Sequence, residues 1–272
     1  MDLNEKLGQL IFGLGSLDSL AVAFSGGVDS SLLLKIAHDV MGNAVLAVIV
    51  DTPTFPRREL HEAVSFVETL KINYKVCEAN NLNIEGFTDN PSNRCYLCKH
   101  DLFTHVWRIA KERNINWIAD GSNYDDIGDY RPGMKALREL EVISPLLEAE
   151  LTKADIRQLA QRMQIKSWDK PAAACLASRF AYGQKISLEK LKMVELGEEC
   201  LFGLGFKQVR VRIHDELARI EVAPEERVNF INEKNLDLIN NKFKELGFAY
   251  TSLDLAGYRT GSMNETMITD KG

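Results

Sequence analysis

The sequence predicts an α/β fold in which a parallel β-sheet carries helices on both faces and is followed by a smaller C-terminal α+β domain. Two observations predict this. Between Leu20 and about residue 169, near-continuous apolar segments of strand length alternate with amphipathic segments of helix length, as in a parallel sheet that is buried on both faces. Beyond about residue 185, helical patterns stand beside short alternating strands, which is typical of an α+β arrangement.

The first part of the chain supplies the elements of the parallel sheet in order. The expected strands are "LAVAF" (20–24), "AVLAVIVD" (44–51), "INYKVCE" (72–78) and "INWIADG" (115–121), and the expected helices span residues 30–40, 57–70 and 99–113. Ligands of such folds bind at the carboxyl ends of the strands. Ser25, Asp51 and Asp120 lie at three of these strand ends, so we expect ligand-binding residues among them.

The second part of the chain changes its pattern. "LTKADIRQLAQRM" (151–163) is expected as a helix with Thr152 as its N-cap and Asp155 completing a motif close to a capping box. "WDKPAAACLASRFAYG" (168–183) lacks periodicity and is expected as a loop. We then expect a helix at 187–203, strands at 207–214 and 218–224, a helix at 225–246 and a strand at 249–255. The sequence thus predicts two domains, residues 1–175 and residues 176–272.

Composition and charge narrow the class of protein. Of the 272 residues, 45% are hydrophobic and 26% are charged, as is ordinary for a globular enzyme. The net charge of −6 does not favour binding to a nucleic acid, which is itself negatively charged. No apolar segment approaches membrane-spanning length, the start lacks the basic region of a signal peptide, and an odd number of cysteines, five, argues against a disulfide scaffold. We therefore expect a cytoplasmic protein with no nucleic-acid and no membrane partner.

The stretch "LAVAFSGGVDSSLLLK" (20–35) joins the first strand to the first helix through a bend with two glycines. Backbone N–H groups in such a bend point at a common centre, and the helix N-terminus adds partial positive charge, which together favour an anion. The spacing matches neither the Walker A loop nor G-x-G-x-x-G. A plain turn with a capped helix is the alternative. The candidate anion-binding residues are Ser25, Gly26, Gly27, Val28, Asp29 and Ser30.

The string "SGGVDSS", directly after an apolar strand, resembles the PP-loop of the ATP-pyrophosphatase superfamily. The resemblance implies an adenine nucleotide alpha hydrolase-like fold and a reaction that cleaves ATP between its α and β phosphates, adenylates a substrate and releases pyrophosphate. Asp29 would hold a Mg²⁺ ion that neutralises the phosphates. Asp51 and Arg131 are further candidates for nucleotide binding, although Arg131 is as well explained by a structural ion pair.

Further strings resemble the LarE family over about residues 20–260. They are "GDYRPGMKALRE" (128–139), "CLASRFAYG" (175–183), "VRVRIHDELARIEV" (209–222) and "LDLAGYRTGSMN" (253–264). The resemblance implies a sulfur transferase in the synthesis of the nickel-pincer nucleotide cofactor. Such an enzyme adenylates a carboxylate of pyridinium-3,5-biscarboxylic acid mononucleotide and converts it to a thiocarboxylate.

This substrate carries a phosphate and two carboxylates, so it requires paired cations. Arg210 and Arg212 are two residues apart on an expected strand and share a face, where two guanidiniums would clamp an anion. A solvated strand edge with surface ion pairs is the alternative. Glu198 and Glu221 match positions that line the substrate site in the family. Each could equally be a helix-surface or a strand-face carboxylate. The expected catalytic set is Cys175, Asp29, Arg179 and Ser178.

The cysteines bear on the source of the sulfur. The family implies two sources: a sacrificed cysteine of the chain, or a [4Fe–4S] cluster on three cysteines whose remaining iron carries an exchangeable sulfide. The sequence has a C-x-x-C at Cys95 and Cys98 and a third cysteine at Cys175, which is the cluster set, whereas Ala174 stands where the sacrificial cysteine would lie. A zinc site that includes a histidine and a redox dithiol are the alternatives. Cys77 and Cys200 are expected as buried small hydrophobes.

The expected cofactors are therefore ATP, Mg²⁺ and a [4Fe–4S] cluster. The expected partners are a small-molecule nucleotide substrate and a sulfide donor, and the family implies a homo-oligomer. Two other functions remain open from the sequence. One is a tRNA-thiolating PP-loop enzyme, and the other is a non-catalytic nucleotide-binding protein with a structural zinc.

Overall fold

The computed structural model describes residues 1–127, 133–171 and 174–259. The described chain forms two compact units, each with its own sheet. The first unit comprises Met1–Ile84 and Asn93–Ala173, and the second comprises Glu85–Ser92 and Ala174–Gly272. No helix among the described residues is long and apolar enough to cross a membrane.

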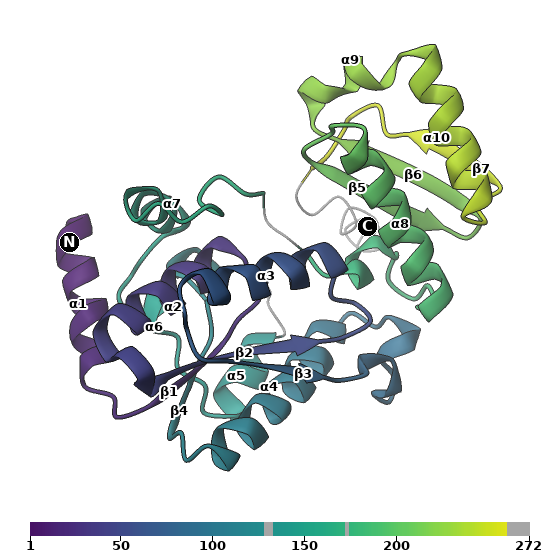
Figure 1. Cartoon of the computed structure of the whole chain (residues 1–272). Coiled ribbons are helices and arrows are strands. Elements are labelled where there is room, and N and C mark those ends of the chain that lie inside the picture. The colour runs from purple at the N-terminus through teal and green to yellow at the C-terminus, as the bar shows by residue number, and fades with distance from the viewer. Residues whose placement is uncertain (128–132, 172–173, 260–272) are drawn as a thin grey trace, which may run out of the picture. The chain divides into compact units, whose positions relative to one another are not determined.

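The first unit is built on a parallel sheet of four strands in the order β3-β2-β1-β4 (Figure 1). The strands are β1 (Leu20–Ala23), β2 (Val45–Asp51), β3 (Tyr74–Glu78) and β4 (Trp117–Ala119). β2 is buried from Val45 to Val50, because side chains of a parallel sheet are covered on both faces. This confirms the predicted α/β class.

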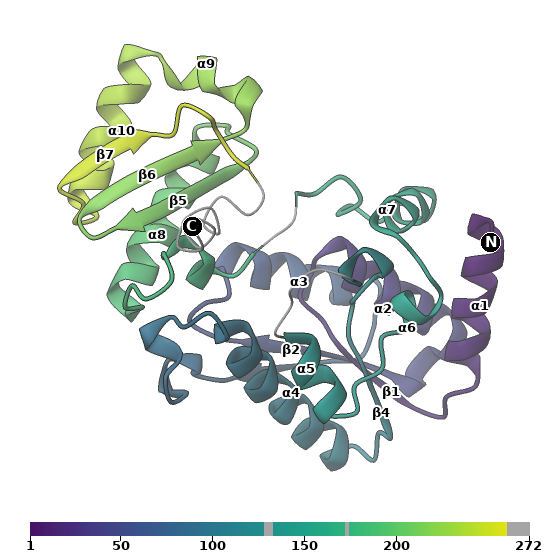
Figure 2. The ribbon, with the colours of Figure 1, turned by 180° about the vertical axis from the view of Figure 1, so that it is seen from behind.

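Helices cover both faces of this sheet (Figures 1 and 2). Val45, Ala47 and Ile49 of β2 contribute to one hydrophobic core, and the alternating residues Leu46 and Val48 contribute to the other. The first core is completed by α1 (Leu3–Gly15), α2 (Val28–Met41), α3 (Arg57–Thr69), α6 (Pro145–Glu148) and α7 (Lys153–Arg162). The second is completed by α4 (Arg94–Glu112) and α5 (Gly133–Glu139).

Two helix starts show how well the sequence defined the boundaries. The capping box of α7 is confirmed, since the Thr152 hydroxyl accepts from the Asp155 N–H and the Asp155 carboxylate accepts from the Thr152 N–H. The start of α4 was predicted wrongly at residue 99, because the helix begins at Arg94, after Asn93. The C-x-x-C motif therefore lies on the first turns of a helix and not in a loop before it.

The second unit contains a sheet of three strands in the order β5-β6-β7. β5 (Val209–His214) runs antiparallel to β6 (Leu217–Val222), which runs parallel to β7 (Tyr250–Leu253). Its helices are α8 (Leu188–Gly203), α9 (Arg227–Phe230) and α10 (Glu233–Glu245). The single helix expected at 225–246 is divided, because the Asn232 side chain caps a new helix start at the Lys234 N–H.

Short 3₁₀ turns complete the described chain: η1 (Gly42–Ala44), η2 (Asn81–Asn83), η3 (Phe87–Asp89), η4 (Tyr124–Asp126), η5 (Leu176–Arg179) and η6 (Pro224–Glu226). The segment that carries η3 belongs to the second unit although it precedes α4. Asn90 is fully buried there, and its amide donates to the Ala181 carbonyl at 2.6 Å. The Ile186 N–H donates to the Thr88 carbonyl at 2.8 Å. A side-chain and a backbone hydrogen bond thus join two distant segments of sequence in one unit.

Candidate functional site

The bend between β1 and α2 has the geometry of an anion site. Gly26 has a φ of +72°, a conformation that side chains disfavour, and α2 begins at Val28 with Gly27 as N-cap. No described side chain caps the first turn of α2, so its N–H groups are available to a ligand. The hydroxyls of Ser25 and Ser30 lie 3.2 Å apart beside this turn.

A neighbouring loop packs closely against this bend. Gly121 follows β4, and a Cβ atom at Gly121 would lie 3.0 Å from the backbone nitrogen of Ser30. On another side, a Cβ atom at Gly26 would lie 3.2 Å from that of Ala63 on α3. The absence of side chains at these glycines therefore allows three segments of the first unit to meet around the first turn of α2.

Asp29, the expected Mg²⁺ ligand, pairs with a residue that sequence reasoning missed. The Lys153 ammonium forms an ion pair with the Asp29 carboxylate, which also accepts from the Asn123 amide at 3.4 Å. The Lys153 N–H in turn donates to Asp125 at 2.8 Å. The capping box at Thr152 is the one sequence signal for Lys153, because it places Lys153 at the first position of a helix.

The remaining strand-end residues of the first unit are engaged by neighbours. Asp51, at the end of β2, pairs with Arg57 and accepts from one of its guanidinium nitrogens at 2.8 Å. Asp120, after β4, is buried and accepts from the Ser144 hydroxyl at 2.7 Å and the Ser122 hydroxyl at 2.5 Å. Arg131 lies outside the described residues.

Arg179 forms a buried ion pair in the second unit. Arg179 is 2% exposed, and its guanidinium donates to the two carboxylate oxygens of Glu198, each at 2.9 Å. The same guanidinium donates to the Cys175 carbonyl and to the Ser178 hydroxyl, both at 3.0 Å. Burial alone would lower the pKa of Arg179, but the charge and hydrogen bonds of Glu198 outweigh it and raise the pKa. Arg179 therefore holds the backbone that carries Cys175.

Arg212 on β5 is likewise tied to a buried acid. It donates to Glu221 on β6 at 2.8 Å, and Glu221 is fully buried. Another nitrogen of Arg212 donates to the Ser178 carbonyl at 3.0 Å. Arg219 approaches the other oxygen of Glu221 at 3.2 Å. Glu198 and Glu221 thus lie in the protein interior, where they pair with arginines. Glu198 is therefore not an exposed helix-surface carboxylate.

Arg210 shares the face of Arg212 but has different surroundings. It donates to its neighbouring Val209 carbonyl at 2.7 Å, and its guanidinium lies 5.1 Å from the centre of the Tyr258 ring. Burial lowers the pKa of Arg210, and the positive charge of Arg179 lowers it further. The two arginines of the expected clamp are therefore both buried, and the surroundings of Arg210 disfavour its charged form.

Comparison with known proteins covers almost the whole chain. Residues 4–94 match the family model described as NAD synthase. The chain is 40% identical over 265 residues to an uncharacterised protein of Synechocystis sp., spanning 97% of this chain and 99% of that protein. It is 32% identical over 241 residues to an uncharacterised protein of Methanocaldococcus jannaschii, spanning 89% and 91%. It is 37% identical over 266 residues to the pyridinium-3,5-bisthiocarboxylic acid mononucleotide synthase of Lactiplantibacillus plantarum, spanning 97% and 96%.

The chain belongs to the LarE family. It is an enzyme of the PP-loop ATP-pyrophosphatase kind, a sulfurtransferase, with an adenine nucleotide alpha hydrolase-like fold in its first unit. Membership of the PP-loop group implies ATP and Mg²⁺ as its nucleotide and ion. The resemblance drawn from the PP-loop and the later strings is thereby confirmed.

The cysteines of this LarE-family chain fall into two groups. Cys95 and Cys98 are three residues apart at the start of α4, exposed and half-buried respectively, and Cys175 of the second unit is exposed. Among the described residues, no three histidine, cysteine, aspartate or glutamate side chains gather as a metal site would. Cys77 is buried as expected, whereas Cys200 is only half-buried. Burial raises the pKa of the Cys200 thiol, which disfavours its nucleophilic thiolate form.

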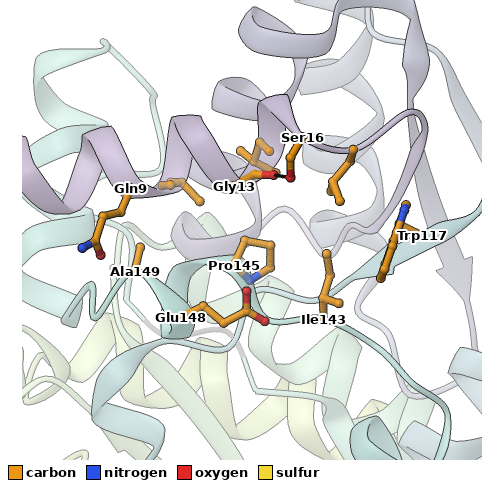
Figure 3. Close-up of a pocket in the computed structure, with 11 residues that line it drawn as sticks. Gln9, Gly13, Ser16, Trp117, Ile143, Pro145, Glu148 and Ala149 are labelled. Atoms are coloured by element: carbon orange, nitrogen blue, oxygen red, sulfur yellow. Dashed lines mark hydrogen bonds between the residues drawn. The ribbon is translucent and has the colours of Figure 1, made fainter.

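A separate pocket lies in the first unit between α1 and α6, beside the edge strand β4 (Figure 3). Gly13, Trp117, Ile143 and Pro145 line it. None of the residues expected in the LarE-type site lines this pocket. The pocket is therefore distinct from the PP-loop.

Proposed function

We propose that this chain adenylates a carboxylate of pyridinium-3,5-biscarboxylic acid mononucleotide and then replaces the adenylate by sulfur, giving a thiocarboxylate for the nickel-pincer nucleotide cofactor. The first step forms an acyl–phosphate bond at the α-phosphate of ATP and releases pyrophosphate. The second forms a carbon–sulfur bond and releases AMP. The observation that carries the proposal is the uncapped first turn of α2 in a chain that is 37% identical to a named synthase over nearly its full length.

The PP-loop would bind the ATP phosphates. The free N–H groups at the start of α2 and the hydroxyls of Ser25 and Ser30 are donors for phosphate oxygens. Mg²⁺ would replace the Lys153 ammonium on Asp29, since a divalent ion neutralises ATP phosphates better than a lysine does. The displaced ammonium would then be free to contact the leaving pyrophosphate.

The second unit would bind the anionic substrate. Arg210 and Arg212 project from one face of β5, and Glu221 fixes the direction of the Arg212 guanidinium. Arg179 and Ser178 would act near the reacting carbonyl, because both are hydrogen-bonded around the Cys175 backbone. Holding the reactants in place and stabilising developing charge would account for most of the acceleration.

For the sulfur source we propose a [4Fe–4S] cluster on Cys95, Cys98 and Cys175. Three thiols fit the donor chemistry of such a cluster, and the C-x-x-C pair shares a face at the start of α4 because residues three apart on a helix are neighbours. When bound, the cluster would supply an exchangeable sulfide at the iron that lacks a protein ligand. The proposal includes an external sulfide donor and a homo-oligomeric enzyme.

The test measures two properties of anaerobically reconstituted protein, for the wild type and for Cys175→Ala. The first is iron and acid-labile sulfide, expected at about four of each per chain in the wild type and lost in the variant. The second is pyrophosphate release from Mg·ATP, expected only when the pyridinium substrate is present, and retained in the variant. Stoichiometric zinc without iron would contradict the cluster, and no substrate-dependent pyrophosphate would contradict the adenylation.

A further inference from the structure

A buried amide lies beside the C-x-x-C motif. Asn81 begins η2, shortly after β3, and is 1% exposed. Its side-chain nitrogen approaches the sulfur of Cys98 at 3.9 Å, within the range at which a sulfur atom accepts an N–H hydrogen bond. Asn81 and Cys98 both belong to the first unit.

The same amide is fixed by hydroxyl groups at the end of β2. The Asn81 nitrogen donates to the Thr54 hydroxyl at 2.5 Å, and the hydroxyls of Thr54 and Thr52 lie 3.2 Å apart. Both threonines are buried. The amide nitrogen therefore has two acceptors within reach, the Thr54 oxygen in the loop after β2 and the Cys98 sulfur.

The carbonyl oxygen of the same amide has no hydrogen-bond partner among the described residues, although it is buried. A buried oxygen without a hydrogen-bond partner destabilises the folded state, so the amide of Asn81 disfavours folding at this oxygen. An aliphatic residue of the same volume would fill the space without that disadvantage. An aliphatic residue could not replace the hydrogen-bond donors of the Asn81 nitrogen.

We propose that Asn81 is a positioning residue for Cys98, holding its sulfur through an N–H···S hydrogen bond and lowering the electron density on that sulfur. The inference rests on the proposed function, because it gives Cys98 the role of a cluster ligand. Hydrogen bonds to ligand sulfurs help to set the reduction potential of iron–sulfur clusters. A donor stabilises the more negative, reduced cluster, so Asn81 raises the potential.

The first part of the test uses cluster-free protein and asks whether the contact exists. The side-chain amide resonance of Asn81 is followed by ¹⁵N–¹H NMR in the wild type, Cys98→Ala and Cys95→Ala. We expect the resonance to move in Cys98→Ala and to stay in place in Cys95→Ala. An unchanged resonance in Cys98→Ala overturns the inference, whatever the cluster does.

The second part uses reconstituted protein and measures the reduction potential of Asn81→Leu. The matched control is Asn83→Leu, since Asn83 lies on the same turn but is exposed. We expect Asn81→Leu to shift the redox equilibrium about tenfold, or about 59 mV to more negative potential for a one-electron couple, and the control to leave it unchanged. An unchanged potential in a fully loaded Asn81→Leu protein overturns the inference.

Failure of Asn81→Leu to fold and failure of the wild type to take up iron can each be told apart from failure of the inference. If Asn81→Leu does not fold, Thr54→Val takes its place, with Thr54→Ser as the variant that keeps the hydroxyl. Thr54→Val is then expected to shift the potential in the same direction, Thr54→Ser is expected to behave as the wild type, and equal potentials in the two overturn the inference. If the wild type takes up no iron, the cluster of the proposed function fails, and the NMR result alone decides whether Asn81 holds Cys98.

Discussion

Replacing Glu198 by alanine removes the partner of a charge that has no access to water. Glu198 accepts two hydrogen bonds from the Arg179 guanidinium and a third from the Val211 N–H, all at 2.9 Å. Arg179 is 2% exposed and stays charged because its pKa is already far above neutrality. Glu198→Ala therefore leaves a buried guanidinium without its carboxylate and a strand N–H without its acceptor.

The expected loss of stability follows from these contacts. Removing one partner of a buried ion pair destabilises by about 3–5 kcal/mol. The unpaired Val211 N–H adds about 1–3 kcal/mol if no water reaches it. Since whole domains are stable by only about 5–15 kcal/mol, Glu198→Ala is expected to bring the second unit close to unfolding at 25 °C.

The assay can separate the two units within the intact chain. All three tryptophans, Trp107, Trp117 and Trp168, belong to the first unit. Tryptophan fluorescence during urea unfolding therefore follows the first unit, whereas hydrogen exchange of the β5 and β6 amides follows the second. We expect Glu198→Ala to lower the protection of the β5 and β6 amides strongly and to leave the fluorescence midpoint nearly unchanged.

The neighbouring residue supplies a matched control. Glu199 stands next to Glu198 on α8 but is exposed, and exposed substitutions usually change stability by less than about 0.5 kcal/mol. If Glu198→Ala and Glu199→Ala had the same effect on amide protection in β5, the buried-pair argument would be refuted. A double variant, Arg179→Met with Glu198→Leu, should recover much of the loss, because no charge would then remain buried.

Three further predictions concern other parts of the chain. Gly121→Ala would place a Cβ atom 3.0 Å from the Ser30 nitrogen, which is too close for the loop to stay in place. Calorimetry should therefore show that ATP binds about tenfold more weakly, a loss of about 1.4 kcal/mol. Gly13→Ala is the control, because a Cβ atom there meets open space and should leave ATP binding unchanged. Burial lowers the pKa of His214 below its usual 6.5, so the unfolded chain binds the proton more readily. The His214 contribution to stability is full above pH 6.5 and is lost as the pH falls from 6.5 through the lower pKa of the folded state. His214→Gln should flatten the slope of stability against pH that urea unfolding measures between pH 7.5 and 5.5. Inorganic phosphate should increase amide protection in the second unit of the wild type and not in Arg210→Met, since a ligand stabilises the state that it binds.

The sequence was sufficient for the elements whose signals are local. Apolar runs gave the strands of the parallel sheet, and glycines before α2 gave the bend, because backbone conformation at those positions depends on neighbouring residues. The capping box at Thr152 was visible in the same way. The start of α4 was predicted five residues too late, although asparagine is a common residue type at helix starts and Asn93 stands directly before Arg94.

The contacts between distant segments were beyond the reach of sequence patterns. Lys153 meets Asp29 from 124 positions away, and Asn90 docks beside Ala181 from 91 positions away. Neither contact leaves a periodicity or a motif, because each depends on how loops meet in three dimensions. The burial of Glu198 was likewise hidden, since a lone glutamate in a helical pattern reads equally well as an exposed residue.

The buried arginines of the second unit have different surroundings. Arg179 is matched by Glu198, and Arg212 is matched by Glu221. Arg210 lies in the same interior, yet burial and the charge of Arg179 lower its pKa, and the nearby glutamate and tyrosine do not offset this. An anion bound beside Arg210 would favour its charged form, because opposite charges attract strongly in a poorly solvated interior. If the second unit binds the anionic substrate as proposed, we expect the bound carboxylate or phosphate to raise the pKa of Arg210.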